Sequence, residues 1–200
     1  MSNQSFDQPT SYKFTAKTMK IAKQHIAKYP KGRQASAVMP LLDLAQRENG
    51  GWLPRVAMDY VSDLLKMPKI AVYEVATFYT MYNLEPVGKF HVQFCTNLPC
   101  LLRGSDKIVN FAKRHLKISF GETTEDNLFT LTEVECLGAC VNAPMMQIND
   151  DYYEDLDENS TLNILTELRY EKIPKTGSQI SRKSCEPIGG LTSLANGDGD

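Results

Sequence analysis

The sequence predicts an α/β protein in three parts: a small helical bundle over residues 1–85, an α/β domain over residues 86–175, and an extended C-terminal tail over residues 176–200. Three observations predict this division. Apolar residues recur at helical spacing before residue 85, and polar–apolar alternation begins at Lys89. Gly, Ser and Asp dominate the last twenty-odd residues, a composition that buries little apolar surface.

Between residues 13 and about 85 the pattern predicts several short helices separated by tight turns. Val38–Arg47 is one of them, and Asn49-Gly50-Gly51 ends it. Pro54 and Pro68 each stand where the first residue of a further helix would. Such helices must pack on each other or on a neighbour, so we expect their aromatic residues to lie in a core or in a subunit contact. After Pro68 the residues expected on one helix side are Val72, Val75, Ala76, Tyr79 and Tyr82.

The second part alternates strands and helices. Lys89–Phe94 and Leu128–Val134 read as strands, and Ser105–His115 between them reads as a helix. A hairpin follows, with Asn149-Asp150 as its turn. A helix over Leu162–Tyr170 closes the domain. This order predicts a small α/β layer.

Composition and charge exclude several classes of protein. Hydrophobic residues make up 42% of the chain and charged residues 23%, with a net charge of −2 and no basic stripe, which argues against nucleic acid as a partner. No apolar run approaches the ~20 residues of a membrane span, so we expect no membrane insertion. The N-terminus lacks the apolar stretch of a secretory signal, and we expect a reducing compartment, where cysteines bind metal or do chemistry rather than form disulfides.

Four of the five cysteines fall into two pairs, Cys95/Cys100 and Cys136/Cys140, each directly after a predicted strand. The two loops should therefore emerge at the same end of one sheet, where four thiolates can enclose a soft metal centre. Gly138 lies within the second loop, where it can adopt positive φ and let a backbone N–H approach a sulfur.

The spacing alone leaves three interpretations open. An iron–sulfur cluster suits four cysteines from two loops. Structural zinc also takes four cysteines, although two-residue spacings are commoner there. Buried or redox-active thiols are the third, but the Cys-x-x-Cys spacing of a thioredoxin-type dithiol is absent. The spacing does not separate [2Fe–2S] from [4Fe–4S].

Longer motifs resemble one known family. The stretch Val134–Met145 resembles the cluster-binding segment of the thioredoxin-like [2Fe–2S] ferredoxins, and in particular of the 24-kDa-type peripheral subunit of respiratory NADH–quinone oxidoreductase, complex I. Further similar segments are Gly50–Pro54, Val72–Tyr82, Cys95–Gly104 and Cys185–Ser193. The resemblance runs from about residue 15 to residue 193.

The resemblance implies a thioredoxin-like fold with one [2Fe–2S] cluster on Cys95, Cys100, Cys136 and Cys140, preceded by a helical domain that contacts other subunits. It gives Cys185 no role. It also implies that the chain exchanges single electrons with the flavin of an NADH-oxidising partner. FMN and NADH are expected in that partner, because the chain contains neither a Gly-x-Gly-x-x-Gly motif nor a phosphate loop.

No residue is predicted to be catalytic. His25, His91 and His115 are scattered outside the cysteine loops, and His91 reads as an ordinary strand residue. The resemblance implies a place in the peripheral arm of complex I, at the cytoplasmic face of a bacterial inner membrane or the matrix side of a mitochondrial one. Two alternatives remain: the equivalent subunit of an NAD-dependent hydrogenase or formate dehydrogenase, and a zinc-stabilised structural or adaptor protein.

Overall fold

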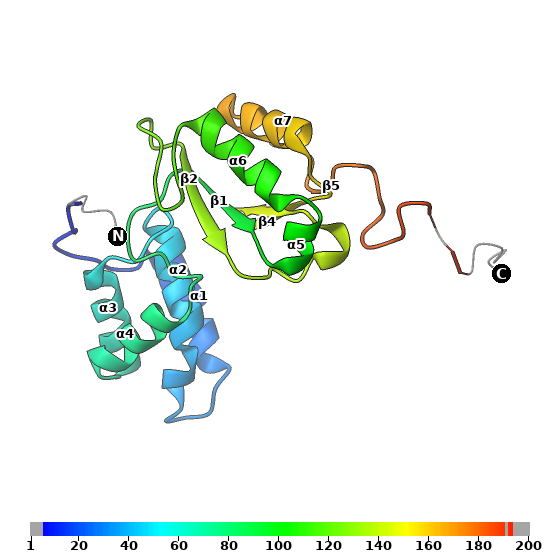
Figure 1. Cartoon of the computed structure of the whole chain (residues 1–200). Coiled ribbons are helices and arrows are strands. Elements are labelled where there is room, and N and C mark those ends of the chain that lie inside the picture. Colours follow the sequence, from blue (N-terminus) through cyan, green and yellow to red (C-terminus); the bar gives the residue numbers. More distant parts are fainter. Residues whose placement is uncertain (1–5, 191, 194–200) are drawn as a thin grey trace. The chain divides into compact units, whose positions relative to one another are not determined.

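The computed structural model describes residues 6–190, 192 and 193 (Figure 1). The chain forms two compact units, and the division between them falls between Val87 and Gly88. Each unit has its own hydrophobic core.

Helices make up the first unit. They are α1 (Ala16–Ala27), a 3₁₀ turn (Gln34–Ala37), α2 (Val38–Glu48), α3 (Arg55–Leu65) and α4 (Lys69–Phe78). Small and branched apolar residues on their inner faces form one core, which includes Ala22, Leu41, Leu42, Val61, Leu65, Val72 and Ala76. Glu48 at the end of α2 accepts hydrogen bonds from the Thr15 backbone N–H (3.0 Å) and the Thr18 hydroxyl (2.9 Å), which fixes the start of α1.

Two details of this unit differ from the sequence-based expectation. Pro54 and Pro68 are the N-cap residues of α3 and α4, not their first helical residues. Helix α4 ends at Phe78, so Tyr82 lies outside the helix in which we expected it. Tyr82 is nevertheless buried, and its hydroxyl donates a hydrogen bond to the Met39 carbonyl oxygen at 2.9 Å.

The second unit is built on a five-stranded sheet in the order β2-β1-β3-β4-β5. The central strand β1 (Phe90–Cys95) pairs in parallel with β2 (Phe129–Val134) and antiparallel with β3 (Met146–Ile148). Strand β4 (Asp151–Glu154) forms the expected hairpin with β3. The short strand β5 (Gly177–Ser178) pairs in parallel with β4 at the edge.

One face of this sheet carries the core of the unit. Alternation along the strands places Val92, Phe94, Phe129, Leu131 and Met146 in a single buried cluster. Helices α6 (Ser105–Leu116) and α7 (Glu158–Arg169) supply the opposing apolar residues and lie side by side over the sheet (Figure 1). Helices α6 and α7 thus cover a face of the sheet and not its ends, so the loops that follow the strands are not covered by them.

Three elements of this unit differ from the sequence-based expectation, either because they were not predicted or because they begin at another residue. A short helix, α5 (Leu98–Leu102), occupies the first cysteine loop. Helix α7 begins at Glu158, four residues before the expected start, because Asp157 and Ser160 form a capping box. Strand β5 lies in the segment that we expected to be an extended tail, so the tail's first residues belong to the sheet.

Candidate functional site

The four paired cysteines lie at one end of the sheet, as the sequence predicted. Cys95 is the last residue of β1 and is in register with Val134, the last residue of β2. Because β1 and β2 are parallel neighbours, the loops that follow them start side by side. Cys100 lies within α5, and Cys140 begins a 3₁₀ turn that ends at Asn142.

The four thiols form one chain of contacts. The Cys95 thiol lies close enough to Cys100 and to Cys136 to shift the pKa of both thiols. The sulfurs of Cys136 and Cys140 are 3.4 Å apart. The structure therefore brings together residues that are up to 45 positions apart in the sequence, from Cys95 to Cys140.

Gly138 adopts the conformation expected for it. Its φ is +84°, in the left-handed region that favours glycine. Its backbone N–H donates to the Cys136 sulfur at 3.4 Å. This hydrogen bond lowers the pKa of the Cys136 thiol, so the loop backbone favours the thiolate, which is the form that binds metals.

The two pairs differ in burial. Cys95 and Cys100 are 2% and 1% exposed and belong to a small apolar cluster with Ala143 and Met145, whereas Cys136 and Cys140 are exposed. Burial and the contact with Cys95 raise the pKa of the Cys100 thiol to about 12. The contact with Cys136, followed by burial, raises the pKa of Cys140.

Side chains tie the two cysteine loops to the sheet and to each other. The Thr96 hydroxyl donates to Glu133 at 2.6 Å, and the Asn97 amide donates to Glu135 at 2.9 Å. The Tyr152 hydroxyl of β4 donates to the Leu137 carbonyl oxygen at 2.8 Å. These supporting residues were not predicted, because nothing in the local sequence indicates which distant loop a Thr, Asn or Tyr will reach.

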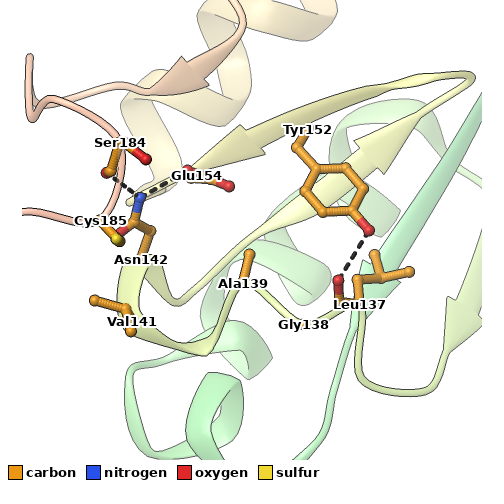
Figure 2. A pocket seen from close by; sticks show the side chains of 9 residues that line it. All are labelled: Leu137, Gly138, Ala139, Val141, Asn142, Tyr152, Glu154, Ser184 and Cys185. Atoms are coloured by element: carbon orange, nitrogen blue, oxygen red, sulfur yellow. Dashed lines mark hydrogen bonds between the residues drawn. The ribbon is translucent and has the colours of Figure 1, made fainter.

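A hollow of about 290 Å³ lies beside the second cysteine loop (Figure 2). Its lining combines the loop, strand β4 and the C-terminal segment: Leu137, Gly138, Ala139, Val141, Asn142, Tyr152, Glu154, Ser184 and Cys185. The fifth cysteine, for which the sequence indicated no role, is thus placed next to the loop of Cys136 and Cys140.

Three further residues lie apart from the thiols or at their edge. Arg103 is exposed, and its Nε donates to the Ala143 carbonyl oxygen at 3.4 Å. His91 lies on β1 with its Nε2 2.7 Å from the Thr132 hydroxyl, and burial lowers its pKa to about 4. Leu98 is 65% exposed at the rim of the first loop.

The donor set fits a two-iron cluster. Four cysteines from two loops are the ligand set of [2Fe–2S] proteins. Within residues 6–190, 192 and 193, no three His, Cys, Asp or Glu side chains are arranged around a position for a single metal ion. Four cysteines are also the ligand set of [4Fe–4S] clusters and of structural zinc sites, so the donor set fits a two-iron cluster without singling it out.

Fold and site together define an α/β protein of the ferredoxin type, with paired cysteines on parallel strand ends. A model of the family described as thioredoxin-like [2Fe–2S] ferredoxin matches residues 22–169. The chain belongs to this family, which binds one [2Fe–2S] cluster.

Two relatives are similar over most of their length. The chain is 56% identical over 160 residues to the E subunit of the NADH-quinone oxidoreductase of Rickettsia conorii, covering 80% of this chain and 96% of the relative. It is 52% identical over 185 residues to the mitochondrial "NADH dehydrogenase [ubiquinone] flavoprotein 2" of Dictyostelium discoideum, covering 92% of this chain and 75% of the relative.

Among solved structures, an NAD⁺-reducing [NiFe]-hydrogenase matches 67% of this chain with a TM-score of 0.58 and 20% identity, over 23% of its own chain. At this identity the likeness concerns the fold alone. Among the helices that the structure describes, none is both long and apolar enough to cross a lipid bilayer.

Proposed function

We propose that this chain is the electron-transfer subunit of an NADH:quinone oxidoreductase, with one [2Fe–2S] cluster held by Cys95, Cys100, Cys136 and Cys140. The observation that carries the proposal is the 56% identity to the Rickettsia conorii relative, over 96% of that relative's length. The contact chain of the four thiols supports the ligand assignment.

The bound cluster would supply a one-electron redox group, and the chain's own residues would set its surroundings. The apolar cluster around Cys95 and Cys100 would keep water from that side. The Gly138 N–H would stabilise negative charge on the Cys136 sulfur. The exposed pair would give an electron a short path to a partner.

The proposed partner is the subunit that carries FMN and oxidises NADH, within the peripheral arm of the complex. Apolar side chains exposed beside the thiols support a docking surface there: Leu98, Leu101, Leu102 and Val141, which are 65%, 49%, 77% and 64% exposed. We infer that the arm lies on the cytoplasmic face of a bacterial inner membrane, or on the matrix side in a mitochondrion. The alternative assembly is an NAD-dependent hydrogenase or formate dehydrogenase.

The helical unit is the second proposed contact with other subunits. At the end of α4, Phe78 is 77% exposed and Tyr79 40%, and Met81 just beyond is 51% exposed. We expect Phe78→Glu to abolish co-purification with the flavoprotein and to leave iron content unchanged. Tyr29→Glu, at another exposed position of the unit, is the matched control. Co-purification that survives Phe78→Glu would refute this contact, and the subunits recovered would identify the assembly.

The test of the cluster itself is iron and acid-labile sulfide per chain after anaerobic purification, with EPR after reduction. We expect two irons, two sulfides and a spin-half signal that Cys136→Ser abolishes. Cys185→Ser is the matched control, because it removes a neighbouring thiol that we do not assign as a ligand. Stoichiometric zinc without sulfide would overturn the proposal in favour of a structural zinc protein.

A further inference from the structure

The C-terminal segment from Ser178 to Glu186 folds back onto the second cysteine loop through one buried arginine. The Arg182 guanidinium pairs with Asp155 at 2.7 Å, and the two side chains are only 5% and 3% exposed. Its Nη1 also donates to the carbonyl oxygens of Val141 (3.3 Å) and Glu186 (3.2 Å). Val141 directly follows Cys140, so the guanidinium contacts the backbone of the loop that carries the exposed thiols.

Asn142 makes a second link between the same segments. Its Nδ2 donates to the Ser184 carbonyl oxygen at 2.8 Å and to Glu154 at 2.7 Å (Figure 2). Its own backbone carbonyl oxygen accepts from the Asp155 N–H at 2.7 Å. The loop is thus tied at two consecutive residues, Val141 and Asn142, to strand β4 and to the C-terminal segment.

A gain in stability does not by itself account for the buried pair of Arg182 and Asp155. A buried ion pair contributes little net stability, because both charges lose their hydration. In addition, Arg182 Nε is buried without a hydrogen-bond partner among the described residues. The planar guanidinium instead fixes the positions of its acceptors relative to one another, because its N–H groups point in fixed directions. Here the acceptors are the Asp155 carboxylate and two backbone carbonyl groups.

We propose that Arg182 is a positioning residue that, with Asp155, clamps the C-terminal segment against the loop Cys136–Asn142. The clamp fixes the backbone that directs the thiols of Cys136 and Cys140. Its consequence for the cluster rests on the proposed function. The clamp itself is a property of the chain, because all its partners are side-chain and backbone groups of this protein.

The first experiment follows amide hydrogen exchange in the cluster-free protein. We expect Arg182→Met to speed exchange of the Asn142 and Ala143 amides about tenfold, which corresponds to about 1.4 kcal/mol of local opening. The amide of Leu131 in the sheet should not change. Lys183→Met is the matched control, since it removes an adjacent exposed cation. Exchange at Asn142 and Ala143 equal to that of the wild type would overturn the clamp.

A double variant separates the clamp from general unfolding. Arg182→Met alone leaves the buried Asp155 carboxylate without an opposite charge, although the Ser178 hydroxyl still donates to it at 2.7 Å. Asp155→Asn with Arg182→Met removes both charges. Faster loop exchange in the double variant, with Leu131 unchanged, supports the clamp. Loop exchange that equals the wild type in the double variant overturns it.

The second experiment uses the cluster-containing protein. We expect Arg182→Met to accelerate loss of visible absorbance to an iron chelator about tenfold and to alter the EPR g-values. For Arg182→Lys we expect a chelation rate and g-values between those of the wild type and those of Arg182→Met, because lysine keeps the ion pair but cannot donate to both carbonyl groups. Unchanged chelation rates and g-values in Arg182→Met would overturn the effect on the cluster. Wild-type protein without iron and sulfide would instead refute the proposed function, while hydrogen exchange would still decide the clamp.

Discussion

The two cysteine pairs are chemically alike but are held in different ways. Cys95 and Cys100 are buried in an apolar cluster, and they continue a central strand into a short helix. Cys136 and Cys140 are exposed, in a loop whose shape depends on hydrogen bonds to strand β4 and to the C-terminal segment.

The contrast indicates that the proposed cluster site has two kinds of structural support. The first pair is held mainly by hydrophobic burial, which is non-directional, and in addition by the hydrogen bonds of Thr96 and Asn97. The second pair is fixed by directional polar contacts, which can change without unfolding the sheet. We therefore expect changes near the first pair to act on stability as well as on the cluster, and changes near the second pair to act mainly on the cluster.

Serine substitutions of the cysteines have the largest expected effect, which is the complete loss of the cluster signal. Cys100→Ser and Cys136→Ser should both abolish the spin-half signal, since each removes a proposed ligand. In the cluster-free protein, Cys100→Ser should lower the free energy of unfolding by about 1–3 kcal/mol, because it buries a hydroxyl in an apolar cluster. Cys136→Ser, at an exposed position, should change it by less than about 0.5 kcal/mol. Urea denaturation measures both, and equal losses would remove the distinction between the pairs.

Acid should destabilise the folded protein through His91, which lies on β1, the strand that ends at Cys95. His91 has a pKa of about 4 in the folded protein, because burial disfavours its charged form, against 6.5 for the unfolded chain. As the pH falls from 6.5 to 4, the unfolded state takes up a proton that the folded state does not. The free energy of unfolding should then fall by on the order of 3 kcal/mol.

The measurement is urea unfolding of the cluster-free protein at several pH values. His91→Gln should remove this component of the pH dependence, and above pH 6.5 the histidine itself should contribute none. A wild-type and a His91→Gln protein with the same pH profile would contradict the assignment.

The smallest contrast concerns the glycine of the second loop. Gly138 and Gly121 have φ values of +84° and +81°, and an added Cβ would meet no atom within 4 Å at either position. Alanine should cost about 1–2 kcal/mol of unfolding free energy at both, from backbone strain.

The two variants should differ at the cluster. Gly138→Ala disturbs the N–H that donates to Cys136, so the reduction potential should become more negative, whereas Gly121→Ala should leave it unchanged. Redox titration followed by EPR measures the shift. Equal potentials in both variants would show that this N–H does not tune the site.

Local sequence patterns predicted most elements of the fold. The spacing of apolar residues indicates which segments are helices and which are strands. Because a strand was predicted before Cys95 and another before Cys136, both loops were expected at the same end of the sheet, and the register of β1 and β2 confirms this. The positive φ of Gly138 was also predicted from its place in the loop. The start of α7 was missed because its apolar stripe begins after its capping residues.

The α/β class, the four paired cysteines and the family could all be predicted from the sequence, because each rests on residues near one another in the chain or on motifs taken in order. The folded chain was needed to show which pair is buried, where Cys185 lies and which residues hold the second loop. Arg182 and Asp155 are 27 residues apart, and Asn142 and Ser184 are 42 apart. Which distant residues meet depends on how the whole chain folds, and the local spacing of apolar residues gives no information about that.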